Sequence, residues 1–289
     1  KNIRAVDCAN RPGHFDGGRQ MAGGLGAVRL ARCVVASHNF DLRHGMKLHS
    51  WLSVLLLLAT HAGAAPTCQT TSAPVPPTVV ELYTSQGCSS CPPADQWLSG
   101  MKGRADVVAL AFHVNYWNHL GWKDPFATSQ TTQRQHAYRS ELGSGYVYTP
   151  QVVVNGRDFR DWRGLQPEKL PKPQAAAAPR VRMWREEDTV RVSIAALPLS
   201  AVASPTRLAG YWVVLQDGLR SKVSAGENAG ALLTNDHVVK RYEPVASWLS
   251  DQPQALSWGA PEGPSQHVAF VVTQAQGLVP VQALVLTCT

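Results

Sequence analysis

The chain has 289 residues, of which 44% are hydrophobic, and its formal net charge is +7 at pH 7. Residues 1–65 hold 8 of the 27 basic and 3 of the 20 acidic residues, which leaves a net charge of only +2 for residues 66–289. A basic surface of the kind that binds nucleic acid is therefore not indicated. The apolar content is ample for one large or two small folded domains.

The N-terminal part of the chain has the features of an export signal. A short basic start at Met46-Lys47 precedes the apolar stretch Trp51–Ala59, and Ala62-Gly63-Ala64 fits a cleavage site. The apolar stretch is too short to span a bilayer. We therefore expect residues 46–65 to be a signal peptide and the mature protein to be periplasmic or secreted, with no stable membrane anchor after cleavage. Residues 1–45 are interpreted as an over-extended reading frame or a disordered leader.

The next feature is a pair of cysteines two residues apart. Thr78–Tyr83 is short, β-branched and apolar, as expected of a buried strand. The motif Cys88-Ser89-Ser90-Cys91 follows it, and Pro92-Pro93 suits the first turn of a helix. Unpaired N–H groups and the helix dipole favour a thiolate at such a position. We predict that Cys88 is the attacking sulfur of a redox pair and Cys91 the resolving thiol.

A second apolar run, Asp106–Val114, predicts a parallel strand, so that strand, helix and strand make a βαβ unit. Functional residues of open parallel sheets gather beyond the C-terminal ends of the strands. His113 falls at such an end, where it could stabilise the Cys88 thiolate. The alternative is a histidine that only completes a hydrogen-bond network.

The later segments predict a helix, a hairpin and a second domain. Asp124–Leu142 favours a helix, and Tyr148–Gly156 favours a strand that enters through Pro150 and leaves through an Asn-Gly turn. A proline directly before a central strand is best explained by a cis Thr149–Pro150 bond. Residues 171–180 are low in complexity and bounded by prolines, which indicates a linker. Short alternating runs beyond it predict an all-β sandwich in residues 181–289.

The remaining cysteines of the expected mature chain lie near its two ends. Export places the chain in an oxidising compartment, where disulfides persist. With Cys88 and Cys91 forming the close pair, we predict a structural disulfide between Cys68 and Cys288. The sequence alone allows three connectivities for four cysteines.

The order of strand, Cys-x-x-Cys, helix, strand and Thr149-Pro150 resembles the thioredoxin superfamily. More narrowly, the chain looks like the exported bacterial family DUF1223. The blocks that carry this resemblance are Glu81–Asp95, Gly121–Phe126, Tyr148–Gly156, Gly226-Glu227-Asn228 and Asp236–Val239. The resemblance implies an α/β thioredoxin-like domain, a central sheet flanked by helices, in residues 66–170, followed by a smaller all-β sandwich-like domain.

The resemblance also implies roles for single residues. Cys88 matches the superfamily's nucleophile, Cys91 its resolving cysteine, and Pro150 the cis-proline that faces the sulfurs. Glu81 lies near where thioredoxins hold a buried acid, so it is a candidate acceptor for the proton of Cys91. A partly exposed strand end is the other interpretation of Glu81.

These features predict an exported thiol–disulfide oxidoreductase that acts on protein or small thiol and disulfide substrates and needs no cofactor. One alternative is a periplasmic soft-metal module in which Cys88 and Cys91, with His113, hold Cu(I). Another is a partner-binding protein without catalysis. A zinc site would need two more nitrogen or sulfur ligands at suitable spacing. Glu227 and His237 are interpreted as structural.

Overall fold

The computed structural model describes residues 68–174, 177–198, 200, 204–262, 266–276 and 278–288. The expected leader and signal peptide, residues 1–45 and 46–65, lie outside these ranges. The described residues belong to one compact unit. Within the described ranges no helix combines the length and the apolar character needed to cross a membrane.

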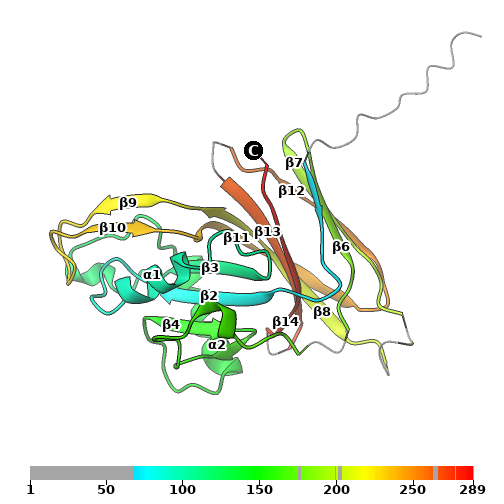
Figure 1. Ribbon diagram of the computed structural model, residues 1–289, viewed down its shortest axis with the longest axis horizontal. Helices are drawn as coiled ribbons and strands as arrows, with labels where there is room; N and C mark the ends of the chain where they lie inside the picture. The colour runs from blue at the N-terminus through cyan, green and yellow to red at the C-terminus, as the bar shows by residue number, and fades with distance from the viewer. Residues whose placement is uncertain are drawn as a thin grey trace, which may run out of the picture. The chain divides into compact units, whose positions relative to one another are not determined.

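Strands make up most of the regular structure (Figure 1). The strands are β1 (Gln69–Thr71), β2 (Thr78–Thr84), β3 (Val107–His113), β4 (Gln151–Val154), β5 (Arg157–Asp158), β6 (Val181–Glu186), β7 (Thr189–Ile194), β8 (Arg207–Gln216), β9 (Leu219–Lys222), β10 (Leu232–Asn235), β11 (Val238–Leu249), β12 (Gln254–Gly259), β13 (Gln266–Gln274) and β14 (Pro280–Leu286). The helices are α1 (Pro92–Ser99) and α2 (Ser129–Glu141), with short 3-10 helices η1 (Asn118–Leu120) and η2 (Pro167–Lys169).

The largest sheet has eight strands in the order β14-β13-β8-β11-β3-β2-β4-β5. Its pairs β2–β3 and β3–β11 are parallel, and the other pairs are antiparallel. A second sheet has the order β1-β6-β7-β12, and β9 and β10 form a separate hairpin. In Figure 1 this hairpin extends beside α1. The eight-stranded sheet therefore combines strands from before and after the predicted linker at residues 171–180.

Alternate side chains of the large sheet enter different cores. One face buries Tyr83, Phe112 and Val213 in a single cluster with Tyr138 of α2. The opposite face divides along the sheet. Over β2, β3 and β4 it packs on α1. Over β8, β13 and β14 it packs on β6 and β7 of the second sheet.

The predicted fold class is wrong. The structure is mostly β-sheet, with two α-helices among the described residues, and it is not an α/β thioredoxin-like domain with flanking helices followed by a separate sandwich. The physical reason is visible in β8, where residues 210–215 are all buried. A strand buried on both faces has to lie inside a sheet with cover on each side. β8 meets this need because β6 and β7 pack against one of its faces, and the cluster that includes Tyr138 of α2 packs against the other.

A disulfide joins the two ends of the described chain. Cys68 precedes β1 and Cys288 follows β14, and their Cα atoms are 5.6 Å apart across a sequence separation of 220 residues. Both cysteines pack against the core between the two sheets. The bond therefore closes nearly the whole described chain into one covalent loop.

Candidate functional site

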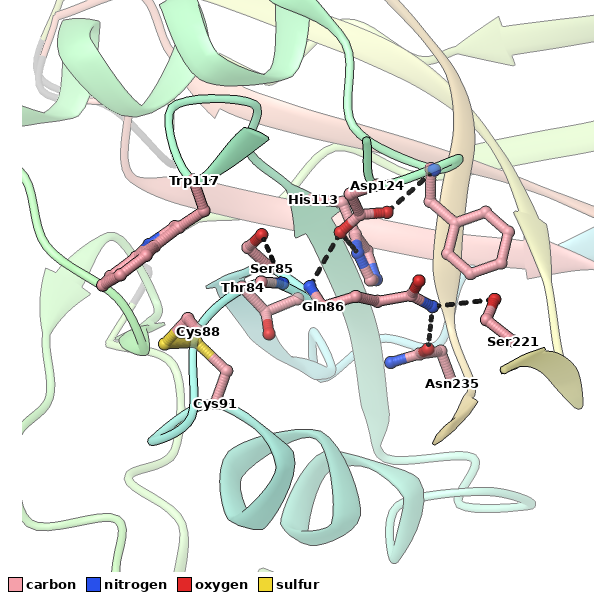
Figure 2. Close-up of polar contacts among 12 residues, drawn as sticks. Thr84, Ser85, Gln86, Cys88, Cys91, His113, Trp117, Asp124, Ser221 and Asn235 are labelled. Carbon is pink, nitrogen blue, oxygen red and sulfur yellow. Dashed lines mark hydrogen bonds and ion pairs between the residues drawn. A yellow bond between two sulfur atoms is a disulfide. The ribbon is translucent and has the colours of Figure 1, made fainter. Parts of the chain in front are cut away.

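The loop that joins β2 to α1, residues 85–91, is called here the cysteine loop. Cys88 and Cys91 form a disulfide in it, with Cα atoms 5.5 Å apart (Figure 2). Helix α1 begins at Pro92, and Cys91 is its N-cap residue. Proline suits this position because its missing N–H would have no partner there and its φ angle is already helical. The predicted placement of the two cysteines between a strand and a helix thus agrees with the structure.

Both cysteines are buried in this disulfide form. Cys88 is 1% exposed and Cys91 is 0% exposed. The Cys88 Sγ lies 3.3 Å from Ser90 Oγ, and Ser90 itself is exposed. A reagent that attacks Cys88 therefore has to displace some of the cover over the cysteine loop.

Trp117 connects the cysteine loop to the segment that precedes β4. A Cβ atom at Gly87 would lie 3.1 Å from the Cβ of Trp117, so glycine permits a close approach here. The Trp117 Nε1 donates to Thr149 Oγ1 at 2.7 Å. The Thr149–Pro150 peptide bond is cis, and Pro150 is buried. The structure thereby brings the segment containing Pro150 and the cysteine loop to the same indole side chain.

A buried polar cluster, defined here as Thr84, Asp95, His113 and Asp124, adjoins the cysteine loop. Thr84 and His113 are partners in the parallel register of β2 and β3. The Thr84 hydroxyl donates to Asp95 Oδ2 at 3.1 Å, and His113 Nδ1 lies 2.8 Å from Asp124 Oδ2. Asp124 Oδ2 also accepts the backbone N–H of Gln86 at 2.8 Å, which links the cluster to the cysteine loop (Figure 2).

Burial governs the charges in this cluster. It raises the pKa of Asp95 from the ordinary value of 3.8 to about 7, although nearby His113 opposes the rise. Burial also works against charge on His113, but the Asp124 carboxylate outweighs it and raises the pKa of His113. Asp124 keeps a lowered pKa because its contacts with His113 and two backbone N–H groups overcome burial. Two buried atoms, Asp95 Oδ1 and His113 Nε2, have no hydrogen-bond partner.

Glu81 lies on the other face of the sheet from α1. Its carboxylate receives two hydrogen bonds from the buried Arg134 guanidinium, at 2.7 and 3.1 Å, and one from Tyr211 at 2.6 Å. Successive strand residues point to opposite faces, and Thr84 faces α1, so Glu81 faces away from it. The structure does not bring Glu81 together with Cys91. The buried acid on the helix of Cys91 is Asp95.

The β9–β10 hairpin reaches the cysteine loop from the C-terminal half of the chain. Gln86 Nε2 donates to Ser221 Oγ at 3.0 Å and to Asn235 Oδ1 at 2.9 Å (Figure 2). The hairpin loop, residues 223–231, adds contacts from two side chains. Glu227 Oε2 accepts from the Ser89 N–H and hydroxyl, both at 2.8 Å. Asn228 Nδ2 donates to the carbonyls of Gln86 and Cys88, both at 2.9 Å.

Sequence reasoning did not select Asp95, Asp124 or Asn228, and it interpreted Glu227 as structural. Asp95 follows Cys91 by one helical turn and shares the buried side of α1 with Leu98, a spacing that could have identified it. Glu227 lies in the block Gly226-Glu227-Asn228, but its contact with Ser89 spans 138 positions, and the sequence does not indicate that pairing. His237 lies just before β11 and is not among the residues that contact the cysteine loop.

The chemistry of the cysteine loop itself is that of two sulfur atoms. Among the residues that the structure describes, no group of three or more His, Cys, Asp or Glu side chains is arranged to hold a metal ion. His113 directs Nδ1 toward Asp124, so one of its two nitrogens is already occupied. The loop holds a disulfide between neighbouring cysteines, with buried ionisable groups close by.

Fold and site together define a class: a mixed β-sheet protein with a Cys-x-x-Cys disulfide in the loop after a central parallel strand. Residues 79–274 match the family described as "Protein of unknown function (DUF1223)". This match covers more than half of the chain, so the chain belongs to the DUF1223 family.

Solved structures that are similar to the chain include the following two. Protein AGR_C_4864 from Agrobacterium tumefaciens is 29% identical with a TM-score of 0.55, over 72% of this chain and 93% of that one. HBP35 of Porphyromonas gingivalis is 13% identical with a TM-score of 0.46, over 74% of this chain and 76% of that one. The first likeness supports the fold, and the second is too distant to carry an argument. Comparison with curated proteins gave no match.

Proposed function

We propose that this protein is a thiol–disulfide exchange protein whose redox pair is Cys88 and Cys91. The observation that carries the proposal is the disulfide between these cysteines, located directly before α1 and beside buried groups that can hold a proton. We also propose that the protein works outside the cytosol. A second disulfide, Cys68–Cys288, supports that location, because oxidising compartments preserve such bonds.

The exchange has two steps that balance in either direction. In the reducing direction the Cys88 thiolate attacks a substrate disulfide, forms a mixed disulfide and releases one substrate thiolate, which takes up a proton. The Cys91 thiol then loses its proton and attacks Cys88 Sγ, which releases the second substrate thiolate. The substrate gains two electrons and two protons, and the pair becomes a disulfide; one proton comes from the Cys91 thiol, and the other is the proton that Cys88 released to solvent when it ionised. In the oxidising direction each step runs backwards.

We propose that Asp95 holds the proton of Cys91, because residues four positions apart lie on the same side of a helix. Its backbone N–H donates to the carbonyl of Cys91 at 3.1 Å, one turn along α1. Burial raises the pKa of Asp95 to about 7, so its carboxyl group can take or give a proton near neutral pH. Asp95 also lines a pocket of about 430 Å³ between α1 and β10, through which the proton could exchange with water.

Trapping tests the proposal. In a Cys91→Ala variant the mixed disulfide on Cys88 has no resolving thiol, so it should accumulate and be detected by mass spectrometry after incubation with oxidised glutathione. A Cys88→Ser variant is the matched control and should form much less adduct, because it removes the sulfur that lies beside the exposed Ser90. The intact chain should catalyse reduction of a disulfide peptide by dithiothreitol. Absence of both adduct and catalysis would refute the proposal.

The soft-metal alternative predicts a different result. Reduced protein titrated anaerobically with Cu(I) would bind one equivalent tightly through Cys88 and Cys91, and it would show no exchange turnover. Tight binding without turnover would replace the exchange proposal by this one.

A further inference from the structure

The hairpin loop holds the cysteine loop by its backbone. Asn228 and Glu227 together bond to the carbonyls of Gln86 and Cys88 and to the N–H of Ser89, so their contacts flank Cys88 on both sides along the chain. The loop is itself ordered by hydrogen bonds, including those from Val223 N to Ala231 O at 2.9 Å and from Gly230 N to Val223 O at 2.8 Å. The position of Glu227 is therefore fixed relative to the cysteine pair.

A carboxylate at this place acts against a thiolate on Cys88. A sulfur anion beside a helix start is stabilised by backbone N–H groups that point toward it. The Ser89 N–H, the one immediately after Cys88, is already bonded to Glu227 Oε2. The carboxylate also places a negative charge against Ser89, the residue next to Cys88 in the chain, and like charges disfavour the ionised form of the thiol.

Glu227 carries this charge throughout the neutral range. The hydrogen bonds from the Ser89 N–H and then the Ser89 hydroxyl hold the pKa of Glu227 below its ordinary value. The side chain is exposed, so the interaction is open to screening by salt.

We propose that Glu227, brought to the cysteine loop by the β9–β10 hairpin, disfavours the Cys88 thiolate and thereby favours the disulfide form of the pair. The proposal rests on the proposed function in assigning the redox pair to Cys88 and Cys91. Glu227 acts through Cys88 and is a positioning residue, not a catalytic one. The C-terminal half of the chain thus sets the redox balance of a pair that lies in the N-terminal half.

The test uses Glu227→Gln, which removes the charge while its amide oxygen can still accept from Ser89. In a Cys91→Ala background, absorbance of the Cys88 thiolate is followed against pH. The variant should raise the thiolate-to-thiol ratio about three- to tenfold at a given pH, as expected for the loss of one nearby charge at a protein surface. With both cysteines present, at a pH where the Cys88 thiolate predominates, equilibrium with reduced and oxidised glutathione should shift toward the dithiol by a similar factor.

Two controls separate charge from anchoring. Glu141→Gln, at the exposed C-terminal end of α2, should leave the titration unchanged. Asn228→Ala removes two backbone contacts without changing charge and should not move the midpoint. An equal shift from Asn228→Ala and Glu227→Gln would overturn the proposal, since anchoring would then explain both.

Salt gives an independent measurement on the unaltered loop. Raising the salt concentration to 1 M should lower the Cys88 midpoint when Glu227 is present and have little effect in Glu227→Gln. No shift from either the substitution or the salt would overturn the proposal. These titrations need no turnover, so failure of the proposed exchange activity and failure of the Glu227 proposal give distinguishable results.

Discussion

Replacing Asp95 by Asn should stabilise the protein at neutral pH and leave its stability nearly unchanged in acid. Asp95 is 8% exposed, and one of its carboxyl oxygens accepts from Thr84 while the other has no partner. An Asn side chain keeps the shape and the acceptor for Thr84, and it carries no ionisable proton. The substitution therefore removes the cost of charging a buried carboxyl group.

The sign follows from the direction of the pKa change. Burial raises the pKa of Asp95 from 3.8 to about 7 in the folded protein, so between these values the unfolded chain has lost the proton that the folded chain retains. Stability from this group is then highest below pH 4, falls as the pH rises, and reaches its lowest value above pH 7. One pKa unit corresponds to about 1.4 kcal/mol, so the full cost is about 4 kcal/mol.

Urea unfolding at pH 4 and pH 8 measures this cost, with both disulfides left intact so that no thiol titrates. Asp95→Asn should raise the free energy of unfolding by up to about 4 kcal/mol at pH 8, and by less than about 1 kcal/mol at pH 4. Asp161→Asn, at an exposed position, is the matched control and should change it by less than about 0.5 kcal/mol at either pH. An Asp95→Asn protein no more stable than the original at pH 8 would refute the reasoning.

Three further predictions concern other contacts. Glu81→Ala leaves Arg134 buried without a counter-charge, so it should lower the free energy of unfolding in urea by about 3–5 kcal/mol. A decrease of less than about 1 kcal/mol would contradict the buried ion pair. Asp124→Asn should lower the pKa of His113 in an NMR titration, because the carboxylate that raises it is gone; an unchanged pKa would argue against the contact. Replacing Cys68 and Cys288 by Ser should cost about 3–5 kcal/mol, since the bond closes a loop across 220 positions, and unfolding curves that coincide with the original would contradict this.

Local sequence patterns predicted the surroundings of the cysteine pair well. The apolar runs that became β2 and β3 are buried along their whole length, and the prolines after Cys91 do begin a helix. These elements form from neighbouring residues, so composition and order along the chain are sufficient to indicate them.

The sheet as a whole could not be predicted in the same way. A single register pair, Val238 with Ala111, joins β11 to β3, supported by a hydrogen bond from Ala111 N to His237 O at 2.8 Å. Nothing near either residue signals this pairing, and the low-complexity segment at residues 171–180 suggested a boundary instead. Short apolar strands fit a separate sandwich and a shared sheet equally well by pattern alone.

The sequence drew attention to Glu81 and not to Asp95 for a related reason. Alternation along β2 places the side chains of Glu81 and Thr84 on opposite faces of the sheet, but the sequence does not indicate which of these faces α1 covers. The Thr84–Asp95 contact shows that α1 covers the face that carries Thr84, so Asp95 lies on that side of the sheet and Glu81 on the other. The ion pair of Glu81 with Arg134 likewise depends on α2 lying over one particular face of the sheet.

The joining of β3 to β11 has a consequence for how the protein is made. The segment holding Cys88 leaves the ribosome well before Val238. Until then the edge of β3 is free at Ala111, and its N–H and C=O groups there can capture a strand from another molecule. A truncated polypeptide ending before Val238 would keep that edge permanently and should self-associate. Once β11 has been synthesised and pairs with β3, this site of self-association is covered.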